Sequence, residues 1–185
     1  FGVFGCMLSV LGCLLANQSV GELQDIRRAA LLGEIETTAM SATVSMSLER
    51  SVTQVALAYH EPIPPGFREI IDAQRALADD GLSQALEYSE NIDFLDVRDD
   101  FVAQTRQSLD RVAALRREID ALLTLEKTSR DAVRSYELPF ELKTEVLAVI
   151  NATALLRIRG NGSSATAAAL QAVQMGAWEV REFGG

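Results

Sequence analysis

Apolar residues recur at steps of three and four along most of the chain, which is the spacing of one face of an α-helix. Stretches of this kind run from the start of the chain to about Tyr59, from about Phe67 to Tyr88, from about Val97 to Leu125 and from about Thr128 to Arg159. A last helix is expected from near Ala165 to at least Phe183. Because alternating strand-like runs are scarce, the sequence predicts an all-α protein.

Each expected helix has one apolar face that must be buried against the others. The first face comprises Leu23, Ile26, Ala30, Val44, Leu48, Val55 and Tyr59, and the second comprises Ile70, Ile71, Leu77, Ala78, Leu82 and Ala85. The third comprises Leu109, Val112, Leu115, Ile119 and Leu122, and the fourth comprises Leu142, Val146, Val149, Ile150 and Leu156.

The connections between these helices are short. Residues 60–66 hold three of the four prolines and should stop the first helix, whereas residues 89–96 and 160–164 read as a turn and a loop. The stretch 128–131 places an acid three residues after a hydroxyl, as at a helix start, and Pro139 should kink or restart the fourth helix. Short connections favour antiparallel neighbours. We therefore expect an up-and-down antiparallel helical bundle with long helices.

The first 21 residues carry no charged side chain, and residues 1–16 are almost all apolar. A membrane-spanning helix needs about 20 such residues, so we expect a transmembrane helix at 1–18, continuous with the first helix of a bundle domain at 19–185. A cleaved or lipidated signal segment, with Cys13 as the modified residue, and a buried core helix are the alternatives. Since the chain begins with Phe and ends in Gly-Gly, we expect the segment to continue before Phe1 and the bundle to continue beyond Gly185.

Composition excludes several functions. The net charge of -9 and the pI of about 4.7 argue against a nucleic-acid partner. Both cysteines, Cys6 and Cys13, lie in the apolar segment, so the rest of the chain cannot form a disulfide. His60 is the single histidine, and no nucleotide, hydrolase or zinc-ligand motif occurs. We therefore expect no enzyme, no metal and no cofactor.

Two stretches are candidates for ligand binding. Residues 43–54 are rich in hydroxyls, and Ser47, Arg50 and Ser51 fall on one helical face. If that face points inward, a guanidinium and two hydroxyls would bind a small anion. Alternatively, Arg50 pairs with an acid on a neighbouring helix and the hydroxyls only allow close packing. The second stretch, residues 177–185, holds the single Trp and adds Arg181 as a further candidate contact.

Several short motifs carry a family resemblance. They are Leu-Glu-Arg-Ser at 48–51, Ile-Pro-Pro at 63–65, Asp-Ala-Gln-Arg-Ala at 72–76, Leu-Arg-Arg-Glu-Ile-Asp at 115–120 and Ala-Trp-Glu-Val-Arg-Glu-Phe-Gly-Gly at 177–185. Together they resemble the periplasmic sensor region of bacterial methyl-accepting chemotaxis proteins. The Glu-Arg pair is also similar to helical nitrate/nitrite-sensing domains, with Ser51 where that family has Gly. The resemblance implies a domain between two membrane helices, followed by a HAMP linker and a cytoplasmic signalling domain.

These observations predict an extracytoplasmic ligand-sensing domain of a transmembrane chemoreceptor, which passes a ligand-induced helix displacement to a cytoplasmic signalling domain. We expect a homodimer in the inner membrane, with residues after about 20 in the periplasm and a small anionic molecule as ligand. One alternative is the sensor of a histidine kinase or a cyclic-dinucleotide enzyme. Another is a membrane-anchored structural or interaction module without ligand. A sensor predicts a cavity lined by arginine and hydroxyls between the first and the last helix, whereas a spacer predicts apolar faces with no buried polar cavity.

Overall fold

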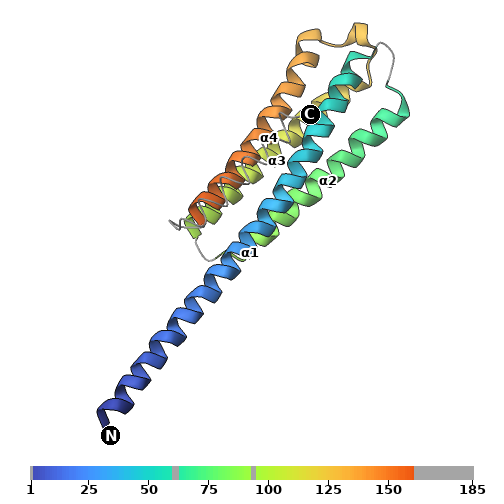
Figure 1. The fold of residues 1–185 in the computed structure, drawn as a ribbon. Helices are drawn as coiled ribbons and strands as arrows, with labels where there is room; N and C mark the ends of the chain where they lie inside the picture. Colours follow the sequence, from blue (N-terminus) through green and yellow to red (C-terminus); the bar gives the residue numbers. More distant parts are fainter. Residues whose placement is uncertain (1, 60–62, 93–94, 161–185) are drawn as a thin grey trace, which may run out of the picture.

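The computed structural model describes the backbone of residues 2–59, 63–92 and 95–160, and the side chains within these ranges from residue 26 onward except 95 and 96. Its elements are the helices α1 (Gly2–Ala58), α2 (Pro65–Ser89), α3 (Leu95–Leu123) and α4 (Ala132–Gly160), with a 3-10 turn η1 (Lys127–Ser129) (Figure 1). No strand occurs within these ranges. The predicted all-α class is therefore confirmed for the described residues, and the last predicted helix, 165–183, lies outside them.

The four helices form an antiparallel bundle (Figure 1). Helix α1 packs along both α2 and α4, and α3 packs along α4, whereas α2 and α3 contact each other sparsely. The first part of α1 extends beyond the other three helices. The long first helix therefore supplies the central contacts of the bundle. The side chains on its inner face are the ones buried between the other helices.

The helix ends follow the local sequence. Helix α2 begins at Pro65, where a missing N–H removes no helical hydrogen bond. Helix α4 begins one residue after Asp131, whose carboxylate accepts a hydrogen bond from the backbone N–H of Arg134 at 3.0 Å. The acid itself is thus the cap, instead of the predicted pairing of an acid with Thr128. Helix α4 continues through Pro139 without a new start.

The inner face of α1 differs from the predicted one. Its buried side chains include Ile35, Ala39, Ala42, Met46, Glu49, Thr53 and Ala56, at alternating steps of four and three. Members of the predicted face such as Ile26, Leu48 and Val55 are instead 65%, 49% and 49% exposed. The prediction was wrong because it followed the largest aliphatic side chains. The buried face combines large side chains such as Ile35 and Met46 with several small ones and one acid.

Gly81 marks the closest approach of α1 and α2. A Cβ atom at this position would lie 3.0 Å from the Cβ of Ala42 and 3.2 Å from the backbone oxygen of Thr38. Gly33, which also lies inside a helix, has no such neighbour within 4 Å. The two glycines therefore form a matched pair, one required by packing and the other not.

Replacing these glycines should have opposite effects on stability. Gly33→Ala is expected to raise the free energy of unfolding by about 0.5–1 kcal/mol, because alanine has the higher helix propensity and nothing obstructs its methyl group. Gly81→Leu is expected to lower it by about 1–3 kcal/mol, because the side chain would force α1 and α2 apart. Urea unfolding of both variants measures the two changes. A Gly81→Leu variant as stable as the parent would show that these helices do not pack closely in solution.

Within the part of the chain that the structure describes, no helix combines the length and hydropathy needed to cross a bilayer. The predicted membrane segment, residues 1–18, precedes the first described side chain.

Candidate functional site

The predicted ligand residues of α1 lie toward the surface of the bundle. Ser47 and Arg50 are half-buried and Ser51 is exposed. The Ser51 hydroxyl donates a hydrogen bond to the backbone oxygen of Ser47 at 2.9 Å, one turn earlier in the same helix. Arg50 makes no hydrogen bond or ion pair with any described residue, so no acid of a neighbouring helix is seen to pair with it. Arg181 lies outside the described residues.

The adjacent residue, Glu49, points into the bundle and is fully buried. Arg75 of α2 donates from Nε to Glu49 Oε1 at 2.9 Å. Arg116 of α3 donates from Nε to the same oxygen at 2.9 Å and from Nη2 to Oε2 at 2.7 Å. One carboxylate of α1 therefore binds guanidinium groups from two other helices.

Further acids complete this buried ion cluster, which we define as Glu49, Arg75, Arg116, Asp120 and Asp79. Arg75 also donates from Nη1 to both carboxylate oxygens of Asp120, at 2.9 and 3.0 Å. Arg116 donates from Nη1 to Asp79 at 2.6 Å. Burial by itself would lower the pKa of Arg116, but its hydrogen bonds and charge interaction with Glu49, reinforced by Asp79, raise that pKa above the ordinary arginine value. Arg116 therefore remains charged at any ordinary pH.

The cluster is a structural junction. Its carboxylates accept from arginines of two helices, and α2 and α3, which otherwise make few contacts, are joined through it. The sequence carried a signal for it, since Glu49 lies seven residues after Ala42 and seven before Ala56, on the face that is buried. An acid in that periodic position must find cationic partners on neighbouring helices.

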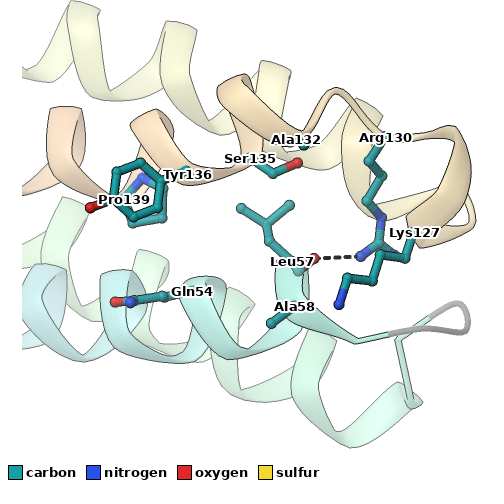
Figure 2. A pocket seen from close by; sticks show the side chains of 9 residues that line it. All are labelled: Gln54, Leu57, Ala58, Lys127, Arg130, Ala132, Ser135, Tyr136 and Pro139. Atoms are coloured by element: carbon teal, nitrogen blue, oxygen red, sulfur yellow. Dashed lines mark hydrogen bonds between the residues drawn. The ribbon is translucent and has the colours of Figure 1, made fainter.

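A cavity of about 310 Å³ lies where α1 ends and α4 begins (Figure 2). We refer to it as the α1–α4 cavity. Its walls are formed by Gln54, Leu57, Ala58, Lys127, Arg130, Ala132, Ser135, Tyr136 and Pro139. The residues come from both helices and from the turn η1 between α3 and α4, so the cavity spans elements that are distant in the sequence.

Arg130 is the buried cation of this cavity, with 7% of its surface exposed. Its Nε donates to the backbone oxygens of Leu122 and Leu125 at 3.1 and 2.9 Å. Its Nη1 lies 2.9 Å from the backbone oxygen of Leu57, with two neighbouring carbonyls of α1 also within reach. One guanidinium thus caps the carboxyl ends of α1 and α3, where a positive charge is favoured by both helix dipoles.

Two donors in this cavity lack partners. The Nη2 atom of Arg130 and the hydroxyl of Ser135 are both buried, and neither has a hydrogen-bond partner among the described residues. Buried polar groups are almost always paired in folded proteins. Other unpaired buried atoms, including Thr53 Oγ1 and Arg75 Nη2, belong to residues that do not line the cavity, so these two atoms by themselves do not mark a binding site.

The cavity lies on the same side of α1 as the predicted residues. Gln54 and Ala58 follow Ser47 by seven and eleven residues, which is two and three helical turns. The structure therefore places the candidate site further along the predicted face. Sequence reasoning noticed Arg130 only as part of a helix start, because nothing local shows that its guanidinium reaches carbonyls about 70 residues earlier.

In comparisons with known proteins, no family model, no characterised protein and no solved structure matches the chain significantly. Among the described residues, no three His, Cys, Asp or Glu side chains are grouped so as to hold a metal ion.

Proposed function

We propose that this chain is an extracytoplasmic ligand-sensing domain of a transmembrane chemoreceptor, and that it binds a small anionic molecule in the α1–α4 cavity. The observation that carries the proposal is a pocket lined by two cations, Lys127 and Arg130, with no acid among its nine lining residues. Such a pocket favours a negatively charged molecule over a cation. The resemblance to chemoreceptor sensor regions supports the same reading.

The position of the cavity supports a sensing mechanism. A ligand shifts a conformational equilibrium only by its differential affinity for the two states. A molecule bound in the α1–α4 cavity would lie against Leu57 and Ala58 of α1 (Figure 2), so its affinity depends on where α1 lies relative to α4. Helix α1 begins in the segment that we propose spans the inner membrane, with the bundle in the periplasm. A displacement of α1 would then carry the signal to a cytoplasmic domain. The type of that domain would distinguish a chemoreceptor from a sensor kinase or a cyclic-dinucleotide enzyme.

We also propose that the domain works as a homodimer. Large apolar side chains are exposed on the outer faces of two adjacent helices, including Leu48 and Val55 of α1 and Tyr136, Phe140 and Leu147 of α4. Such faces are commonly covered by a partner. Sedimentation equilibrium of the detergent-solubilised chain measures the association. A protein that is monomeric at all concentrations would contradict the proposed homodimer.

A thermal-shift screen of the whole chain tests ligand binding. Small inorganic anions, organic acids and amino acids are added separately, and a compound that binds the native state raises the melting temperature in a dose-dependent way. At a concentration one hundred times its dissociation constant, the stabilisation is about 2.7 kcal/mol. A cooperatively unfolding protein that responds to none of them contradicts the sensing proposal and favours a structural module.

A further inference from the structure

Helix α4 carries a second apolar row on the side that faces away from the core. Its apolar members are between 41% and 68% exposed, and they are Val133, Tyr136, Phe140, Leu147, Leu155 and Ile158. Thr144 and Asn151, both exposed, fill the gaps, so the complete row advances in steps of three, four and four, an eleven-residue repeat. This repeat is close to the period of the α-helix, so the row stays on one side of α4. We call these residues the outer row.

The exposed sides of the other helices have a different composition. Among the described residues, the exposed large apolar side chains number six on α4, three on α1, two on α2 and none on α3. The exposed side of α2 carries Asp72, Asp79 and Asp80, so two copies placed together there would repel each other. The outer row contains no charged residue. An uncharged, largely apolar row along a whole helix is typical of an interaction surface.

The two polar positions of the outer row indicate what binds there. If two copies of α4 run parallel, Asn151 faces the partner's Asn151 and Thr144 faces the partner's Thr144, and the facing polar groups can bind each other. If the copies run antiparallel with their rows in full overlap, Asn151 lies against Phe140 and Thr144 against Leu147. That arrangement buries polar groups against hydrocarbon. A facing pair of asparagines in an apolar seam specifies the register of parallel helices.

The residues that follow α4 are the other candidate for covering this row. The helix expected at 165–183 would be about 28 Å long. Running back along α4, it would not reach Tyr136, which lies about 36 Å from Gly160 along the helix axis. The two most exposed members of the row, Val133 and Tyr136, would then stay uncovered. A second copy of α4 covers the whole row.

We propose that two copies of this chain associate through the outer rows of parallel α4 helices, in the register that pairs Asn151 with the partner's Asn151. The inference rests on the proposed homodimer and specifies its helix, orientation and register. Parallel pairing places both copies of α1 at the same end of the dimer, as two chains anchored in one membrane require. Tyr136 also lines the α1–α4 cavity, so a ligand bound there would lie beside the interface.

Charge placed at one position of the row tests the pairing. Leu147→Glu and Leu147→Lys, each in the detergent-solubilised whole chain, should raise the dissociation constant of the dimer about a hundredfold, because like charges would face each other. An equal mixture of the two variants should associate again, since position 147 faces position 147 only in parallel pairing. Leu77→Glu, at an exposed site of α2, is the matched control and should leave association unchanged. Sedimentation equilibrium measures each sample.

Cysteine crosslinking tests the orientation. Ile158→Cys, combined with Cys6→Ala and Cys13→Ala, should give a disulfide-linked dimer on oxidation, whereas antiparallel pairing would hold the two positions about 37 Å apart. Crosslinking of Ile158→Cys only to Val133→Cys chains, or charge variants that remain dimeric, would overturn this inference and leave the homodimer standing. A monomeric parent chain overturns both. A monomer that Leu147→Glu destabilises more than Leu77→Glu does would assign the outer row to residues 161–185 instead.

Discussion

Replacing Glu49 with alanine is expected to lower the free energy of unfolding by about 3–5 kcal/mol. The change removes the carboxylate that binds Arg75 and Arg116, and leaves two largely buried guanidinium groups without it. Glu49→Gln keeps the size of the side chain but not its charge, so it should lose a large part of the same stability. Chemical denaturation monitored by circular dichroism measures both changes.

The control for Glu49 is an acid on the exposed face of the same helix. Glu34→Ala removes a carboxylate that is exposed, and it should change the free energy of unfolding by no more than about 0.5 kcal/mol. If Glu49→Ala behaved like this control, water or the neighbouring acids would be able to replace Glu49. The buried ion cluster would then not be the junction of α1, α2 and α3.

Arg130→Met should lower the free energy of unfolding by about 2–4 kcal/mol. Methionine keeps much of the apolar stem, but the carbonyl oxygens at the ends of α1 and α3 lose a charged donor that binds both. The ends of α1 and α3 should open more often than the rest of the bundle, before the whole domain unfolds. Hydrogen exchange is therefore expected to quicken first at the last turns of α1 and α3, ahead of the middle of the bundle.

Arg117→Met provides the comparison for Arg130, since Arg117 is an exposed arginine of α3. It should leave both stability and exchange at the helix ends unchanged within about 0.5 kcal/mol. Equal exchange patterns in the two variants would show that Arg130 does not cap these helices in solution.

The helices could be predicted because their determinants are local. Prolines at 62, 64 and 65 separate α1 from α2, and the periodic apolar positions of α3 and α4 are the ones that the structure buries. The inner face of α1 could not be found by the same rule. Leu48 and Val55 are larger and more apolar than Ala42, yet Ala42 faces inward, where its close contact with Gly81 requires a small side chain.

The candidate site was harder to predict than the fold. The sequence singled out Arg50 because hydroxyls surround it, and that hypothesis remains a prediction. The buried arginine of the cavity, Arg130, lies instead in a connection, and its partners are backbone oxygens, which every residue possesses. No pattern of residue types can mark such a contact. Only the meeting of three helix ends in space shows it.

The position of Glu49 also restricts how far α1 can slide along its neighbours. Its inner face repeats every seven residues through Ile35, Ala42, Glu49 and Ala56, so a slip of one repeat, about 10.5 Å, would leave a similar row of small apolar side chains in contact. Glu49 distinguishes the two registers most strongly, because after such a slip alanine would face Arg75 and Arg116. The ion pairs thus oppose sliding of α1 by a whole repeat. Any movement of α1 that transmits a signal must therefore be much smaller than this step, small enough for flexible arginine side chains to follow.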